Sequence, residues 1–136
     1  MKRRIFTLMI IGLVFFISCN NNDENTTETI DGVWHLKSID GSFAGRFDYI
    51  KGEVKLDFNL DNNTVLIENN IVTTGPEDTY AGFDSGTYDF KIIENEQEEE
   101  VLFIDDIEQG VIILLDDTLK IDDCIACDGT LSEFER

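Results

Sequence analysis

Residues 53–59 read Glu-Val-Lys-Leu-Asp-Phe-Asn and contain the clearest fold signal in the chain. Val54, Leu56 and Phe58 alternate with charged or amide side chains, so an extended segment here has one apolar and one polar face. Alternation with a period of two is typical of an antiparallel strand that lies between a core and solvent. The segment therefore predicts a half-buried strand.

Similar segments occupy most of the chain that follows. Residues 61–63, Asp-Asn-Asn, predict a tight turn into a partner strand, because Asn and Asp tolerate turn conformations. Outside the first 18 residues we find no convincing helical period. We predict eight strands, at residues 33–39, 53–59, 64–69, 86–93, 101–104, 111–115, 118–122 and 130–135. This pattern indicates an all-β fold and favours a small eight-stranded antiparallel up-and-down barrel.

The lengths of the predicted connections differ between the two ends of such a barrel. One end, which we call the mouth, would hold residues 40–52, 70–85, 105–110 and 123–129. The other end, which we call the base, would hold residues 60–63, 94–100 and 116–117. Because the two longest connections share the mouth, the pattern favours a cup with a closed base.

Aromatic residues are concentrated on the two longest connections. Rings on glycine-containing loops can gate or line an apolar pocket, and the alternative is that they fold inward and cap the core. The candidate ligand-binding residues at the mouth are therefore Phe43, Phe47, Tyr49, Tyr80 and Phe83.

The first 18 residues have the organisation of a cleavable export signal. Met-Lys-Arg-Arg precedes an apolar run over residues 5–17, which is shorter than the roughly 20 residues of a membrane-spanning helix. Ser18 and Cys19 follow, and this junction resembles the lipobox of bacterial lipoproteins, although Phe16 stands where Leu is usual. The resemblance implies cleavage before Cys19 and acylation of its thiol. The alternative is a plain secretory signal followed by an incidental cysteine.

Residues 19–30 are predicted to be a lipid-anchored, disordered tether, since residues 20–29 include no apolar side chain. Asp23 and Glu24 resemble the acidic surface-export signals of some bacterial lipoproteins, which implies a location in the outer membrane and exposure at the cell surface. The folded domain would then span residues 31–136.

The charge of the chain excludes some partners. Its 29 acidic and 10 basic residues give a formal net charge of −19, and removal of Lys2, Arg3 and Arg4 with the signal would change this value to −22. Such a protein repels nucleic acid and anionic lipid surfaces. Contact with the membrane would therefore depend on acylated Cys19.

Several segments together resemble the lipocalin-like domains of small bacterial lipoproteins. Gly32 and Trp34 are similar to the G-x-W at the start of the first lipocalin strand. The other matching segments are the loop 41–45, the strand 53–59, residues 119–122 and the terminal residues 133–136. The resemblance implies a closed barrel that binds a small hydrophobic ligand at its mouth.

A closed barrel would bring Trp34 and Arg136 together at the base, because the first strand then pairs antiparallel with the last. A guanidinium over the indole is worth about 0.5–2 kcal/mol. The alternative is that Trp34 is simply a core aromatic, and both interpretations are structural. Since the tether enters at the base, we expect the mouth to face away from the membrane.

Cys124 and Cys127 form a C-x-x-C motif among aspartates, which would raise the pKa values of the thiols. A zinc site would need two further ligands, and His35 is the single histidine of the sequence. In an oxidising envelope we expect a local disulfide. Free thiols, or a metal or redox role, are the alternatives.

We predict neither catalysis nor a cofactor. The spacing of residues 57–63 with Glu68 matches a calcium-binding EF-hand loop, but Asn62 replaces its glycine and strands flank it. A lone histidine forms no catalytic constellation. Two functions remain: a module that binds a small hydrophobic ligand, and a filled barrel that acts as a structural or interaction module toward an envelope or host protein. Bulky inward residues such as Phe58 and Phe90 favour the second.

Overall fold

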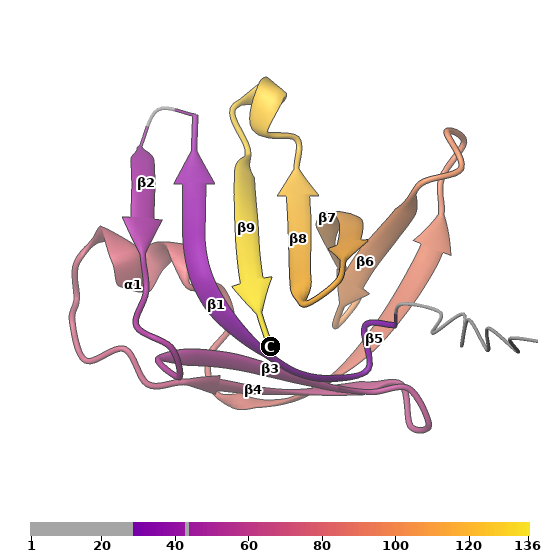
Figure 1. The fold of residues 1–136 in the computed structure, drawn as a ribbon, viewed down its shortest axis with the longest axis horizontal. Helices are drawn as coiled ribbons and strands as arrows, with labels where there is room; N and C mark the ends of the chain where they lie inside the picture. Colours follow the sequence, from indigo (N-terminus) through magenta and orange to yellow (C-terminus); the bar gives the residue numbers. More distant parts are fainter. Residues whose placement is uncertain (1–28, 43) are drawn as a thin grey trace, which may run out of the picture.

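The computed structural model describes residues 29–42 and 44–136, which form an antiparallel β-barrel (Figure 1). Its elements are β1 (Gly32–Gly41), β2 (Gly45–Asp48), β3 (Val54–Asn59), β4 (Thr64–Asn69), α1 (Pro76–Tyr80), β5 (Gly86–Glu94), β6 (Glu100–Ile104), β7 (Ile107–Leu115), β8 (Thr118–Asp123), η1 (Ile125–Cys127) and β9 (Thr130–Glu135). Strands β3 to β9 follow in chain order, and β1 closes the ring by pairing with both β3 and β9. β2 pairs with β1 outside the ring. The predicted eight-stranded up-and-down barrel is confirmed, with one extra strand.

The stretch 53–59 forms β3 as expected. Its register with β4 places Leu56 opposite Ile67 and Phe58 opposite Val65, so the alternating apolar residues of both strands meet in the core. Residues 60–63 form the tight connection between them, with Asn63 at a φ of 54°. Local periodicity and turn chemistry account for this hairpin.

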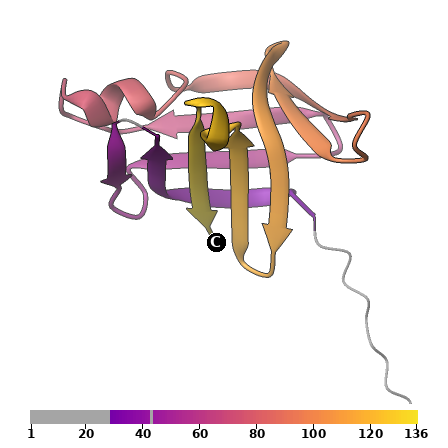
Figure 2. The same cartoon turned by 90° about the horizontal axis from the view of Figure 1, so that it is seen from above.

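β1 serves two parts of the barrel because it bends. Its first half, from Gly32 to His35, pairs with β3, and its second half pairs with β2. A register shift against β9 between Leu36 and Ser38 marks the bend. Figure 1 shows this curvature, and Figure 2 shows β3 and β4 crossing β8 and β9 at a steep angle. The bulge therefore lets one strand join two crossing groups of strands.

Two connections predicted at the mouth contain regular structure that the pattern did not reveal. Part of residues 40–52 folds back on the end of β1 as β2, with Gly45 at a φ of 81°. In residues 70–85, α1 forms one helical turn, which begins at Pro76 and has Glu77 and Asp78 in its first turn. Four strand residues or one turn are too short to show a period.

The third predicted mouth connection, residues 105–110, is wrong. β7 begins at Ile107 rather than at residue 111, so the connection is only Asp105 and Asp106. Their φ values of 51° and 62° are those of a two-residue hairpin turn. β6 and β7 pair on both sides of a register shift that lies between Leu102 and Phe103.

Bulky side chains fill the base half of the barrel. Trp34, Phe58, Val65, Leu102 and Leu119 are each no more than 1% exposed. The rings of Phe58 and Phe90 meet edge to face, with centroids 5.1 Å apart. Close packing of this kind leaves no space around these side chains. A second hollow of about 200 Å³ remains at the rim of the base, where its apolar lining residues are Ile30, Leu60, Ile92, Ile112 and Leu114.

The predicted export signal, Cys19 and most of the predicted tether lie outside the described residues. Within the described part of the chain, no helix is long and apolar enough to cross a bilayer.

Candidate functional site

A cavity of about 200 Å³ lies in the mouth half of the barrel. Ten of its lining residues are apolar and come from the inward faces of six strands and from the segment after α1: Leu36, Ile39, Val54, Leu56, Ile67, Ala81, Phe83, Ile104, Ile121 and Phe134. Polar residues join the lining on β7, β8 and β9: Glu108, Gln109, Asp123, Thr130 and Ser132. The cavity therefore has an apolar and a polar side, and the polar part of its surface is slightly the larger.

The hollow exists because inward side chains become smaller toward the mouth. Along β9 the inward positions change from Phe134 near the base to Ser132 and Thr130 near the mouth. Gly110 on β7 is not part of the lining. A Cβ atom there would lie 2.3 Å from the carbonyl oxygen of Asp122 on the paired strand β8, so the close approach of the two strands requires glycine.

The structure does not bring the predicted mouth aromatics into one site. Phe83 lines the cavity, and its ring centroid lies 5.1 Å from that of Tyr88. Phe47 and Tyr49 instead line a separate groove between β2 and the segment before α1. Tyr80 is the last residue of α1, and Phe43 lies outside the described residues.

Sequence reasoning missed most of the lining, which comes from strands rather than loops. Ile39, Ile67 and Ile121 are inward core positions, and the sequence marks them only as apolar. Nothing local distinguishes a core residue that faces a hollow from one that faces another side chain.

Tyr49 joins the two long connections at the mouth. Its hydroxyl donates to the carbonyl oxygen of Glu77 on α1, at 2.9 Å. Burial, followed by the negative charges of Glu77, Glu53 and Asp78, raises the pKa of Tyr49 to about 12. The phenol therefore stays protonated at neutral pH and remains a hydrogen-bond donor.

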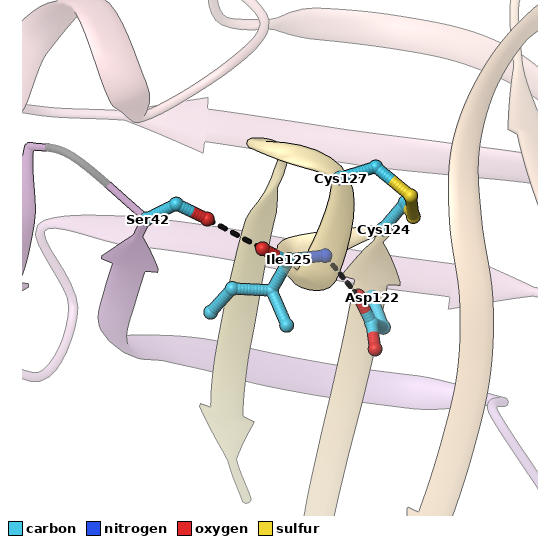
Figure 3. Close-up of a disulfide and its surroundings, with 5 residues drawn as sticks. All are labelled: Ser42, Asp122, Cys124, Ile125 and Cys127. Atoms are coloured by element: carbon cyan, nitrogen blue, oxygen red, sulfur yellow. Dashed lines mark hydrogen bonds between the residues drawn. A yellow bond between two sulfur atoms is a disulfide. The ribbon is translucent and has the colours of Figure 1, made fainter.

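The fourth mouth connection is closed by the disulfide between Cys124 and Cys127, which is the expected alternative for this pair (Figure 3). The main-chain N–H of Ile125 donates to the Asp122 carboxylate at 2.8 Å, and the Ser42 hydroxyl donates to the carbonyl oxygen of Ile125. The disulfide loop is thereby fastened to the end of β1. Both cysteines serve the structure of the mouth.

Trp34 and Arg136 meet at the base, as the closed barrel requires. The guanidinium carbon lies 4.2 Å from the Trp34 ring centroid, and the same group donates to the carbonyl oxygens of Thr29 and Asp31 at 2.6 and 3.1 Å. The indole N–H donates to the carbonyl oxygen of Ile30 at 2.7 Å. This contact holds the segment before β1 against the end of β9.

The ion pairs of the described chain lie on the outside of the barrel. Glu133 on β9 accepts from Lys37 at 2.6 Å and lies 3.6 Å from Lys120. The hydrogen bond from Lys37 lowers the pKa of Glu133 and raises that of Lys37. Over residues 29–42 and 44–136, no three His, Cys, Asp or Glu side chains gather as metal ligands would.

Comparisons of the chain with family models, with curated proteins and with solved structures find no match.

Proposed function

We propose that this protein is a lipid-anchored lipoprotein of a bacterial envelope whose lipocalin-like barrel binds a small hydrophobic ligand. The observation that supports binding is the hollow of about 200 Å³ in the mouth half of the barrel, which inward side chains of six strands surround. Its ten apolar lining residues, the polar side chains that join them and its position beneath the long connections are what a ligand chamber needs. A purely structural barrel has no requirement for such a hollow, because a cavity reduces stability.

The volume limits the ligand. Sites for drug-sized molecules usually measure about 300–1,000 Å³, whereas an apolar cavity of about 150 Å³ accepts benzene. A chamber of about 200 Å³ therefore suits a single substituted ring or a short branched chain. A long acyl chain does not fit the cavity as it stands.

Methyl NMR of the barrel domain tests this proposal, with toluene and indole as neutral probes. We expect saturable shifts at Ile39, Ile67 and Ile121, which line the cavity. Ile121→Phe fills the chamber and should abolish them. Ile113→Phe is the matched control, because Ile113 is 40% exposed and outside the cavity lining, and it should leave binding intact. Absence of saturable shifts, or binding that survives Ile121→Phe, contradicts the proposal.

The proposed anchor needs its own test. Expressed in a bacterial host, the full chain should incorporate labelled palmitate, and Cys19→Ser should abolish the label. Cys124→Ser is the matched control, since it removes a cysteine whose sulfur is bonded to that of Cys127 in the folded domain. Label that persists in Cys19→Ser contradicts the anchor. Surface digestion of intact cells would then test exposure on the outer membrane.

A second candidate function is a filled barrel that acts as a structural or protein-interaction module. The tight packing of the base half and the small volume of the cavity favour it. Native mass spectrometry of protein purified from its own envelope separates the two functions. A retained small-molecule adduct supports the binding module, and a clean apo mass supports the interaction module.

A further inference from the structure

We propose that the outer edge of β2 is a docking site for an extended, basic peptide segment of a partner protein. This site is separate from the barrel cavity and does not depend on it. Three features support it: the hydrogen-bonding register of β2, the groove beside it and the charge of that groove.

The register leaves main-chain groups of β2 directed away from the barrel. The N–H of Tyr49 donates to the carbonyl oxygen of Lys37 at 2.9 Å, so these opposed residues form a hydrogen-bonded pair. Such pairs alternate in an antiparallel ladder, which makes Phe47 the next residue of β2 bonded to β1. The N–H and C=O groups of Arg46 and Asp48 must therefore point to the opposite edge.

A groove of about 360 Å³ lies between β2 and the segment that leads into α1, and the hydrogen bond from Tyr49 to Glu77 joins its two walls at one point. Five consecutive residues of β2 and its extension line one wall, from Arg46 to Ile50. A strand face presents only alternate residues, so a consecutive lining indicates an edge. Ile71, Thr73 and Glu77 form the opposite wall. In Figure 1, β2 is the outermost strand beside β1, and α1 lies behind it.

One apolar side chain of the groove is left largely in solvent, since Ile50 is 73% exposed. Strand addition uses this combination: main-chain bonds along an edge supply affinity, and alternate side chains of the added strand enter pockets beside it. A groove with two walls can hold one extended segment.

The charge of the groove selects a basic occupant. Its lining has three carboxylates, on Asp48, Glu53 and Glu77, and one guanidinium, on Arg46. That guanidinium is already paired with Asp40 at 3.1 Å and with Asp48 at 2.8 Å. Glu53 accepts the main-chain N–H of Ile50 at 2.7 Å, and among the described residues neither Glu53 nor Glu77 forms an ion pair with a basic side chain. Lys or Arg side chains of an added strand would therefore meet carboxylates whose charge no cation balances.

A second copy of this chain is a poorer occupant. Two molecules that each have a formal net charge of −19 repel one another. β2 has only four residues, two of them charged, and short charged edges discourage self-pairing. The same features still permit a partner of opposite charge.

The test uses an alternating Lys-Val heptapeptide, with an alternating Glu-Val heptapeptide as its matched control. In the free protein, the amides of Arg46 and Asp48 should exchange with deuterium at least tenfold faster than that of Phe47. The Lys-Val peptide should slow both exchanges and bind at least tenfold more tightly than the Glu-Val peptide at low salt. Equal binding of the two peptides, or slow exchange in the free protein, overturns the proposal.

Two variants at one position separate the main chain from the side chain. Asp48→Pro removes the outward N–H and leaves the bonds between β1 and β2, whereas Asp48→Ala removes only the carboxylate. Asp48→Pro should weaken the Lys-Val peptide at least fivefold relative to Asp48→Ala. If Asp48→Pro unfolds, the Lys-Val peptide and the same peptide N-methylated along one edge are compared for binding to the unchanged protein. Equal affinities in either comparison, or a concentration-dependent dimer in sedimentation, contradict the proposed occupant.

Discussion

Replacement of Arg136 by Ala should destabilise the barrel far more than loss of an exposed arginine usually does. The guanidinium carbon lies 4.2 Å from the centroid of the fully buried Trp34 ring, and its nitrogen donates to the carbonyl oxygens of Thr29 and Asp31. A cation–π contact with an exposed cation contributes about 0.5–1 kcal/mol. Two hydrogen bonds at the surface add about 0.5 kcal/mol each. The sum is about 1.5–2 kcal/mol.

Urea unfolding monitored by tryptophan fluorescence measures this loss directly, because Trp34 is the single tryptophan of the chain. A loss of about 2 kcal/mol lowers Tm by about 8 °C in a domain near this size. The matched control is Arg46→Ala, which removes only exposed ion pairs to Asp40 and Asp48 and should cost less than about 1 kcal/mol. If Arg136→Ala costs no more than Arg46→Ala, then the contact with Trp34 does not hold the base together.

Three other perturbations test the mouth and the outer face of the barrel. Gly129→Ala should cost more than about 2 kcal/mol, because its Cβ would lie 1.5 Å from the carbonyl oxygen of Asp123. Gly82→Ala meets no atom within 4 Å and costs only the strain of alanine at a φ of 90°, so it should cost less in the same urea experiment. Reduction of the disulfide between Cys124 and Cys127, which closes a four-residue loop, should lower the free energy of unfolding by about 2 kcal/mol. Identical unfolding midpoints with and without reductant would contradict this. Glu133→Gln should reduce stability at pH 7, because Lys37 lowers the pKa of Glu133 in the folded state. The stability that this carboxylate contributes is present above its unfolded pKa and is lost as the pH falls through the folded pKa. The acid unfolding curves of wild type and variant should therefore converge at low pH.

The strand pattern could be predicted because it is local. The alternation of Val54, Leu56 and Phe58 predicts a half-buried strand without reference to the rest of the chain, and residues 61–63 alone predict the neighbouring turn. The contact between Trp34 and Arg136 could also be predicted, since closure of a barrel makes its first and last strands neighbours. Closure is a property of strand number and order, which the pattern already contained.

The candidate site could be predicted only in part. The sequence predicts Phe83 on a mouth loop, and Phe83 does line the cavity. Phe47 and Tyr49, which are predicted there too, line the groove beside β2 instead. The difference depends on where each connection folds back. Residues 45–48 pair with the end of β1, which directs that connection outward, and a four-residue strand has too few positions to show its period.

Composition, strand pattern and turn chemistry thus determined the fold class, the number of barrel strands and the strongly acidic surface. The tertiary structure alone decided where side chains fill the barrel and where they leave a hollow, and that β2 adds an edge beside a groove. A cavity is the difference between the space enclosed by strands far apart in the sequence and the volume of all their inward side chains. Ser132 and Thr130 on β9 leave space only because Ile39, Ile67 and Ile121 do not reach across to fill it. No local segment specifies that difference, because it is set by packing across the whole barrel.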